Sequence, residues 1–245
     1  MNVSHVIQTR VRPFKKSDSE QVRELYSLAM LYGPRAPVTI ALKHQIYKPF
    51  SWVLYTLFAG GLALSRHSST QVTGMAMSAT VLGLFLAWRR TIWSKFKAFC
   101  QAAVDGDLSD IGKSYSAVLP DSSKLDSSGF WVAEVADGAE VGKIIGAVGL
   151  ASSTNTDPTT AELRRLVVSP SYQGHGVGSL LVNTLLEHAR TRGLTSVFLS
   201  TSMYQRPAMQ LYEHLGFVLD RKVAVQVKIL FIVNTAYLHF YKIKL

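Results

Sequence analysis

The stretch with the clearest chemistry in this sequence combines several glycines with a strand before them and a helix after them. Its centre is Gln173-Gly174-His175-Gly176-Val177-Gly178, which has glycine at every second position. Leu166–Val168 predicts the strand, and a helical pattern continues to about Arg192, where Gly193 follows as a stop signal. Glycine lets a main chain approach a ligand closely, and the free N–H groups of a first helical turn attract negative oxygens. The stretch therefore predicts a binding site for a phosphate or a diphosphate.

The spacing of these glycines excludes two common phosphate-binding motifs. A P-loop needs Gly-Lys-Ser/Thr after its glycines, whereas this chain continues Gly178-Ser179-Leu180. A dinucleotide fingerprint needs the spacing G-x-G-x-x-G, which these glycines do not have. The stretch does match Gln/Arg-x-x-Gly-x-Gly/Ala through Gln173, Gly176 and Gly178, and it resembles the acyl-CoA loop of the GNAT superfamily of N-acyltransferases. A turn that is rich in glycine for steric reasons alone is the alternative.

A second motif lies downstream, from Gln205 to Phe217. It predicts a short helix ending at Gly216 and resembles the GNAT pattern Asn-x-x-Ala-x-x-Leu/Phe-Tyr-x-x-x-Gly-Phe. In that pattern the tyrosine hydroxyl points at the CoA sulfur and donates a proton to the departing thiolate, a role that the resemblance gives to Tyr212. The alternative for Tyr212 is an ordinary buried tyrosine. Gln205 stands where the family usually has asparagine, so its contact with the pantetheine arm departs from the pattern.

Together the two motifs imply a fold and a co-substrate. The resemblance implies an α/β (α+β) GNAT acyltransferase fold, with a mixed central sheet, flanking helices and acetyl-CoA as co-substrate. The strand before the glycines would bind the pantetheine arm through its main chain, and one of its N–H groups would serve as the oxyanion donor. The residues implied in cofactor binding are Leu166, Val167, Val168, Gln173, Gly174, His175, Gly176, Val177, Gly178, Ser179 and Gln205.

The general base is the least defined part of the predicted site. Glu162 opens the strand that leads to the glycines, and some GNAT enzymes use a carboxylate at that end as the base, directly or through water. Glu134 is the second candidate. For either residue the alternative is a solvated carboxylate at a strand end. Direct attack of the amine in a ternary complex is expected, so Cys100 is not needed as a nucleophile. No cluster of cysteine and histidine suggests a metal.

Two uncharged segments in the first half of the chain predict a membrane hairpin at about residues 47–90. Neither Pro49–Leu64 nor Ser68–Trp88 contains a charge, and a polar turn separates them. As helices, Pro49–Leu64 and Gln71–Trp88 would be about 24 and 27 Å long. Against the core of about 27 Å of an endoplasmic-reticulum bilayer each is marginal alone, and together they predict a hairpin. A full span and a shallow hairpin both remain open. A helical pair buried in a soluble core is the alternative, although neither segment has a polar face.

The charges that flank the hairpin predict its orientation. Lysines precede it, arginines and lysines follow it at residues 89–97, and only Arg66 marks its turn. The positive-inside rule then places both ends, and a catalytic domain, in the cytosol. A hairpin inserted between the first helix and the second strand is similar to the camello-like, membrane-anchored branch of GNAT enzymes. Membership of that branch implies the endoplasmic reticulum membrane and an acceptor that is a small amino-acid-type amine, such as a cysteine S-conjugate, or a protein lysine.

Composition is consistent with these assignments. The net charge is +10, but the basic residues are scattered, so nucleic acid is a weak candidate, whereas an anionic cofactor and an anionic membrane surface both suit the charge. A single cysteine excludes an intrachain disulfide. We expect residues 1–32 to supply the first strand and helix, 33–128 to be an insertion, and 129–245 to form the catalytic core. The elements expected are strands at Val6–Val11, Phe130–Val135, Val141–Leu150, Glu162–Val168 and Ser196–Ser200, helices at Val22–Ala29, Phe96–Val104 and Leu108–Tyr115, and two last strands after Asp220.

The sequence thus predicts an acetyl-CoA-dependent N-acetyltransferase of an internal membrane. Because the insertion borders the acceptor mouth in this fold, we expect an amphipathic or membrane-associated amine. Two alternatives stay open: a catalytically inactive GNAT-fold module that interacts at the membrane, and an enzyme that transfers a longer acyl chain.

Overall fold

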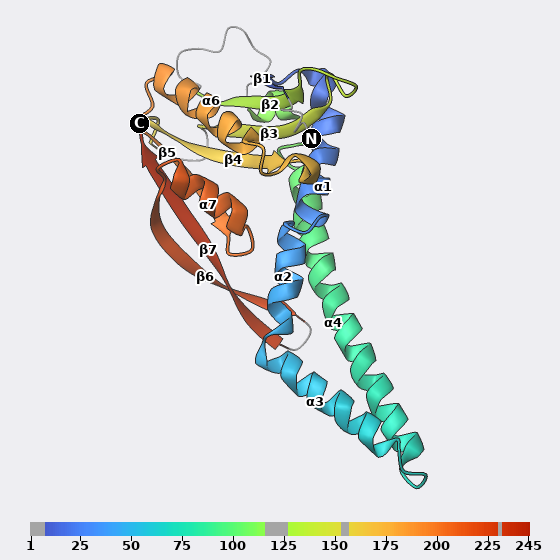
Figure 1. Ribbon diagram of the computed structural model, residues 1–245. Coiled ribbons are helices and arrows are strands. Elements are labelled where there is room, and N and C mark those ends of the chain that lie inside the picture. The colour runs from blue at the N-terminus through green and yellow to red at the C-terminus, as the bar shows by residue number, and fades with distance from the viewer. Residues whose placement is uncertain (1–7, 116–126, 153–156, 230–231) are drawn as a thin grey trace, which may run out of the picture.

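In the computed structural model, residues 8–115, 127–152, 157–229 and 232–245 are described, and their strands form one sheet (Figure 1). The elements in chain order are β1 Thr9–Pro13, η1 Lys16–Asp18, α1 Ser19–Leu31, α2 Pro37–Ile46, α3 Pro49–Leu64, α4 Gln71–Asp105, α5 Ile111–Ser114, β2 Gly129–Val135, β3 Ile144–Ala151, β4 Thr160–Val168, η2 Pro170–Tyr172, α6 Val177–Thr191, β5 Ser196–Ser202, α7 Arg206–His214, β6 Val218–Ile229 and β7 Ile232–Lys244.

The sheet is mixed, with the strand order β1-β2-β3-β4-β5-β7-β6. Neighbouring strands are antiparallel except β4 and β5, which are parallel and are joined through α6. Helices cover both faces, because one core cluster lies under α6 and α7 and another lies under α1 and the end of α4. The predicted fold class is therefore confirmed. Of the predicted first strand, residues 6 and 7 lie outside the described residues, and β1 extends to Pro13.

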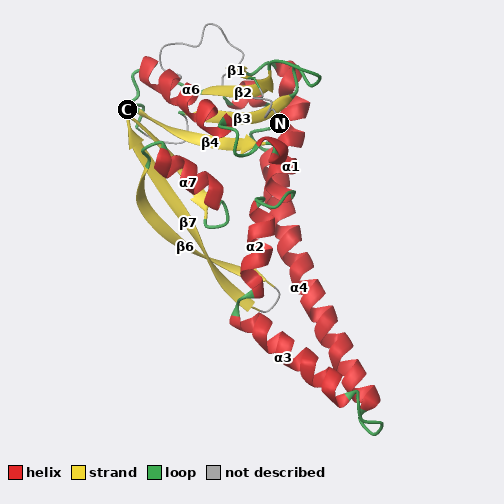
Figure 2. Ribbon diagram, in the orientation of Figure 1, coloured by secondary structure: helices red, strands yellow, loops and turns green. Residues whose placement is uncertain are grey.

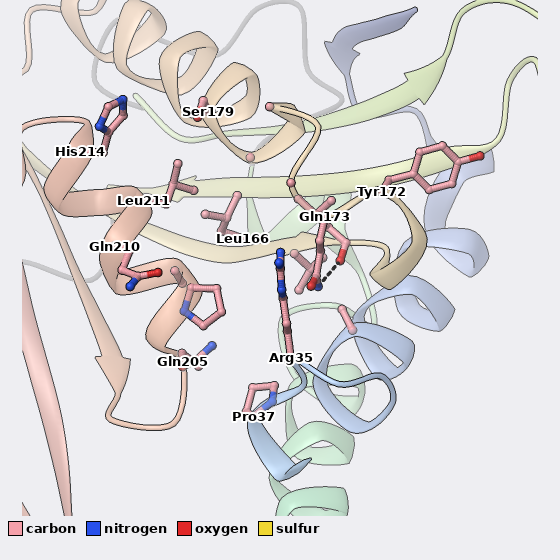
Figure 3. Close-up of a pocket in the computed structure, with 18 of the residues that line it drawn as sticks. Arg35, Pro37, Leu166, Tyr172, Gln173, Ser179, Gln205, Gln210, Leu211 and His214 are labelled. Atoms are coloured by element: carbon pink, nitrogen blue, oxygen red, sulfur yellow. Dashed lines mark hydrogen bonds between the residues drawn. The ribbon is translucent and has the colours of Figure 1, made fainter. Parts of the chain in front are cut away.

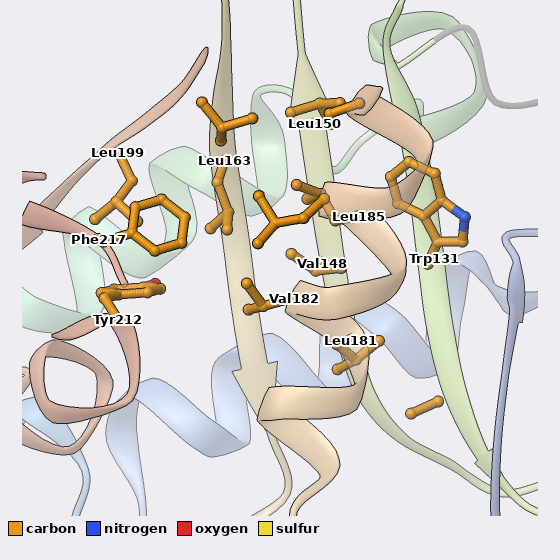
Figure 4. Packing of buried hydrophobic residues seen from close by; sticks show 14 of the residues in the cluster. Trp131, Val148, Leu150, Leu163, Leu181, Val182, Leu185, Leu199, Tyr212 and Phe217 are labelled. Atoms are coloured by element: carbon orange, nitrogen blue, oxygen red, sulfur yellow. The ribbon is translucent and has the colours of Figure 1, made fainter. Parts of the chain in front are cut away.

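Helix α6 shows how the sequence produces this layering. Its apolar residues recur at helical spacing, so that Leu181, Val182 and Leu185 all face the sheet and are fully buried. They pack against β3 and β4 side chains such as Val148 and Leu163 (Figure 4). Burying one such side chain stabilises the fold by about 1.5–3 kcal/mol. This packing fixes the first turn of α6, which follows the glycines, against the end of β4.

Parallel strands β4 and β5 separate soon after they start. They pair only over Thr160–Glu162 and Ser196–Phe198. Beyond these residues β4 runs on to Val168 and β5 to Ser202, and no further β4–β5 pairing occurs within the described strands. The carboxyl ends of the two strands therefore leave an opening between them.

A β-bulge lies in the separated part of β4. The register of β3 and β4 shifts between Ala147 and Gly149, so that two β4 residues, Arg165 and Leu166, oppose one β3 residue. Arg165 has a φ of 57°, a left-handed conformation that is uncommon for a residue other than glycine. The bulge leaves main-chain groups of β4 out of the ladder at the point where β5 has already moved away.

Helices α3 and α4 form a hairpin that extends away from the sheet (Figures 1 and 2). The predicted helix Pro49–Leu64 is confirmed as α3. The prediction that the second helix ends near Trp88 and that Phe96–Val104 is separate was wrong, because α4 is continuous for 35 residues. No glycine or proline interrupts residues 89–104, so nothing in the chain breaks the helix there. Helix α2 was not predicted.

Small residues bring α3 and α4 together. A Cβ added to Gly61 would lie 2.4 Å from Oγ of Ser78, and one on Gly74 would lie 2.5 Å from the carbonyl oxygen of Gly61. The outer surface of the pair is apolar and exposed, with Trp52, Val53, Leu57, Leu62, Val72, Met75, Leu82 and Leu86 all more than two-fifths accessible. By length and composition alone, helix α4 is long and apolar enough to cross a membrane, whereas α3 is shorter. Only 22 % of the most apolar 18-residue stretch of α4 is buried. The described hairpin is thus not a helical pair inside a soluble core.

Candidate active site

A cavity of about 700 Å³ occupies the opening at the end of β4 (Figure 3). Its walls come from β4, from the residues between η2 and α6, from the first turn of α6, from α7 and from the α1–α2 connection. The lining residues are Ala29, Met30, Arg35, Pro37, Leu166, Val167, Val168, Tyr172, Gln173, Gly174, Gly176, Gly178, Ser179, Gln205, Pro207, Ala208, Gln210, Leu211 and His214.

The glycine loop, residues 173–178, forms one wall. Gly174 and Gly176 have φ values of 87° and 80°, which side chains rarely tolerate, and Gly176 immediately precedes α6. Gly178 is held close to α7, because a Cβ there would lie 3.0 Å from Cδ2 of Leu211. The amide of Gln173 donates a hydrogen bond of 3.1 Å to the carbonyl of Val168, which ties the loop to β4. The loop therefore presents the main chain of the first turn of α6 to the cavity.

Most of the residues predicted to bind the cofactor come together here. Leu166, Val167 and Val168 line the cavity from β4, and Gln173, Gly174, Gly176, Gly178 and Ser179 line it from the glycine loop and α6. Two residues of the same prediction are placed elsewhere. His175 is exposed and Val177 is buried in the core under α6, and neither lines the cavity.

Gln205 also lines the cavity, at the start of α7. Its side-chain oxygen accepts hydrogen bonds from the hydroxyl of Thr201 at 3.0 Å and from the main-chain N–H of Ser202 at 3.2 Å. These bonds anchor the amide group at the end of β5. Its nitrogen points toward the sulfur of Met30, 4.0 Å away, on the opposite wall.

Tyr212 does not line the cavity, and the neighbouring Leu211 does. The Tyr212 side chain is 5 % exposed and packs beside Phe217 and Tyr241, with ring centroids 5.6 and 6.2 Å away (Figure 4). Burial raises the pKa of its hydroxyl well above the usual value, so this group keeps its proton at physiological pH. The prediction that Tyr212 acts as an acid therefore rests on the sequence motif, since the side chain is not part of the cavity lining.

The two carboxylate candidates differ in their surroundings. Glu162 lies on β4, four residues before Leu166, which is about 13 Å along an extended strand. Its side chain is partly exposed, and its nearest cation is Nε of Arg164 at 3.7 Å. Glu134 is buried on β2 and accepts hydrogen bonds from Arg10 and Arg12. Burial would raise its pKa, but the two arginines outweigh burial and hold the pKa below its usual range. Glu134 therefore stays ionised in its ion pairs with Arg10 and Arg12, and it is poorly suited to accept a proton.

Sequence reasoning missed a buried network behind the β4 bulge. Arg165 donates two hydrogen bonds to Asp107, of 2.9 and 2.5 Å, and a third of 3.0 Å to the hydroxyl of Tyr26. The hydroxyl of Tyr115 also bonds to Asp107. Burial would raise the pKa of Asp107, but the bonds from Arg165 and Tyr115 lower it below its usual range. This network connects the end of α4 with α1 and β4, and no local sequence motif predicts it.

Charge is sparse in the cavity. Among the described residues that line it, Arg35 is the only one that carries a permanent charge. Within the described part of the chain, no three histidine, cysteine, aspartate or glutamate side chains gather as metal ligands do. The arrangement suits an elongated anionic ligand, with its negative group on the glycine loop and a thinner arm along the free edge of β4.

Comparison with known proteins agrees with this geometry. Residues 93–217 match the family model of the Acetyltransferase (GNAT) family. The chain is 32 % identical over 211 residues to N-acetyltransferase 8B of Homo sapiens, with 84 % of this chain and 83 % of that protein covered. It is 29 % identical to the protein of Xenopus tropicalis named "Probable N-acetyltransferase camello", over 86 % of each protein. It is 27 % identical to N-acetylaspartate synthetase of Danio rerio, over 86 % of this chain and 67 % of that protein.

Solved structures share the fold. The protein yncA of Salmonella typhimurium, solved with its cofactor acetyl-CoA, superposes with a TM-score of 0.50 at 16 % identity, over 96 % of this chain and 93 % of that one. From the family match and the relatives that cover most of its length, the chain belongs to the GNAT family of N-acetyltransferases, among relatives that include N-acetyltransferase 8B and camello.

Proposed function

We propose that this protein transfers the acetyl group of acetyl-CoA to the amine of an amino-acid-type acceptor, a cysteine S-conjugate or a lysine, on an internal membrane. The observation that carries the proposal is the cavity between the separated ends of β4 and β5, with the glycine loop at one wall and unpaired β4 main chain beside it. The amine attacks the thioester directly in a ternary complex.

The residues of the cavity fit acetyl-CoA. The main chain of Gly174 to Ser179 would hold the diphosphate, because the left-handed Gly174 and Gly176 place no side chain of their own between the main chain and the ligand. Leu166, Val167 and Val168 would bind the pantetheine arm along the free edge of β4, and Gln205 would contact it from the other side. Bound acetyl-CoA supplies the activated acetyl group. A main-chain N–H at the bulge of β4 would stabilise the negative charge on the carbonyl oxygen.

Two side chains would move the protons. Tyr212, which stays protonated at physiological pH, would donate a proton to the leaving thiolate. Glu162 would accept the proton of the amine, and its distance from Leu166 along β4 requires a chain of waters between the two groups. The motif that includes Tyr212 supports the first assignment, and the position of Glu162 on the cavity strand supports the second.

The α3–α4 hairpin would insert into the endoplasmic reticulum membrane, with the catalytic domain in the cytosol. The exposed apolar surface of the hairpin and the basic residues at its base support this arrangement. Pro37 lines the cavity and begins α2, and α3 starts three residues after α2 ends. The acceptor mouth would therefore lie near the lipid surface, which favours an amphipathic amine. Protease treatment of intact microsomes checks the topology, since a fully protected C-terminus would reverse it.

The deciding experiment is a panel of amines assayed with labelled acetyl-CoA. The panel contains cysteine S-conjugates, peptide lysine, aspartate and polyamines. We expect turnover of a cysteine S-conjugate or of lysine, and equal activity toward fully polar aspartate would count against a membrane-associated acceptor. Longer acyl-CoA donors in the same assay determine the acyl chain. Binding of CoA without turnover of any amine would instead indicate an inactive module.

A further inference from the structure

The glycine loop provides no cation for the negative charge of a diphosphate. Where the family pattern allows arginine, this chain has Gln173, and the amide of Gln173 is occupied by the carbonyl of Val168. His175 is exposed and lies outside the cavity lining. Main-chain N–H groups and the helix dipole attract a diphosphate, but they leave its two negative charges without a counter-charge.

Arg35 supplies a positive charge on the opposite wall. It belongs to the α1–α2 connection, distant in sequence from the loop, and its side chain stands in the cavity beside Gln173 (Figure 3). A Cβ added to Gly174 would lie 3.7 Å from Nη1 of Arg35, so the guanidinium directly faces the loop. Within the described residues Arg35 makes no hydrogen bond or ion pair to the protein, which leaves its donors available to a ligand.

The backbone that carries Arg35 is fixed, although the side chain is exposed. The carbonyl of Gly33 accepts hydrogen bonds from the N–H of Ala36 at 3.3 Å and from the hydroxyl of Thr39 at 2.9 Å. Gly33 has a φ of 101°, and a Cβ there would lie 3.1 Å from Cβ of Pro170, so this turn packs tightly against η2. The position of the arginine relative to the glycine loop is therefore set by the fold.

We infer that Arg35 binds the diphosphate of acetyl-CoA from the side opposite the glycine loop and is a specificity-determining residue for the coenzyme. Guanidinium groups bind phosphates through paired, charge-assisted hydrogen bonds. This inference rests on the proposed function, because it requires CoA in the cavity. A carboxylate of the acceptor is the other anion that an arginine here could bind, and the experiment separates the two.

The test compares Arg35→Ala and Arg35→Lys with Arg190→Ala, a matched loss of charge at an exposed position near the far end of α6. The first readout is the Kd of CoA, measured by calorimetry without acceptor. We expect Arg35→Ala to raise this Kd about ten- to hundredfold, Arg35→Lys to recover part of the loss, and Arg190→Ala to match the wild type. The ratio between the Kd of Arg35→Ala and the Kd of the wild type should shrink at high salt, because salt screens the attraction between Arg35 and the diphosphate in the wild type.

The second readout uses S-acetylpantetheine, a thioester that lacks the diphosphate. Arg35→Ala should raise the KM for acetyl-CoA and leave unchanged both the KM for S-acetylpantetheine and the KM for the amine that the panel identifies. An unchanged Kd for CoA in Arg35→Ala, or a rise confined to the KM of the amine, would overturn the inference while the proposed function stands. A wild-type protein that binds no CoA would overturn both.

Discussion

Replacing Asp107 should destabilise the protein strongly, because it leaves the largely buried guanidinium of Arg165 without its carboxylate and with only the Tyr26 hydroxyl as a partner among the described residues. Both side chains of this pair are only 15 % exposed, and Arg165 bonds Asp107 through two of its nitrogens. Removing one partner of a buried pair costs about 3–5 kcal/mol. The residual exposure places Asp107→Ala near the lower end, about 3 kcal/mol. For a chain of this size that corresponds to a fall in Tm of about 6–12 °C.

The assay is thermal unfolding of the full chain in detergent, with Asp105→Ala as a control. Asp105 lies close by in sequence but is exposed at the end of α4, so its loss should leave the Tm nearly unchanged. The double variant Asp107→Leu/Arg165→Met removes both charges and should recover much of the loss, since a hydrophobic pair of similar volume often substitutes for a buried ion pair. A Tm for Asp107→Ala within about 1 °C of the wild type would refute the reasoning, since the predicted loss is several times larger.

The difference in Tm between the wild type and an Asp107 variant should depend on pH with a defined sign. The pKa of Asp107 is lowered in the folded protein, so the stabilisation that it provides is fully present above its unfolded value, about 3.9. That stabilisation is lost as the pH falls from the unfolded pKa through the lower pKa of the folded protein. The Tm difference between wild type and Asp107→Asn should therefore be constant near neutral pH and shrink below about pH 4.

Three further substitutions test the site and the hairpin. Tyr212→Phe keeps the packing of the ring and should lower kcat about a hundredfold by removing the acid, with an unchanged Tm; unchanged kcat would assign Tyr212 to the core alone. Glu162→Gln should lower kcat by a similar factor of about a hundred while the KM for acetyl-CoA stays constant, and a change confined to that KM would contradict a role as base. Gly61→Leu would place atoms against Ser78 and separate α3 from α4, so cysteines introduced across the two helices should crosslink less efficiently than in the parent; equal crosslinking would disprove the close contact.

The features that the sequence revealed are those encoded locally. Alternate glycines, a strand and a helix are contiguous, so the glycine loop and its lining residues could be predicted from spacing and family resemblance. The uncharged length of Pro49–Leu64 likewise defined α3. Between residues 89 and 104 the expected break was based on the change from apolar to charged residues, but charge alone does not end a helix, and α4 continues.

The residues that were missed depend on tertiary contacts. Arg35 faces Gly174 only because the α1–α2 turn packs against η2, and Asp107 meets Arg165 across 58 positions of sequence. A lone arginine in a turn, or an aspartate after a helix, carries no periodic signal by itself. The sequence left open whether Tyr212 is an ordinary buried tyrosine, because the face of α7 that meets the sheet depends on where β7 places Tyr241.

The uninterrupted course of α4 determines how the protein can be divided. Its first residues pack on α3 through Gly74, whereas near its other end Cys100 and Ala103 are part of the core under the sheet. The helix is about 52 Å long and has no internal glycine or proline after Gly83 at which to bend. Deleting the whole helix would therefore remove side chains from the core, whereas an internal deletion within the hairpin that stops before Phe96 would spare Cys100 and Ala103. Because α4 runs without a break from the hairpin into the core under the sheet, a tilt imposed at the turn between α3 and α4 would move the sheet with it.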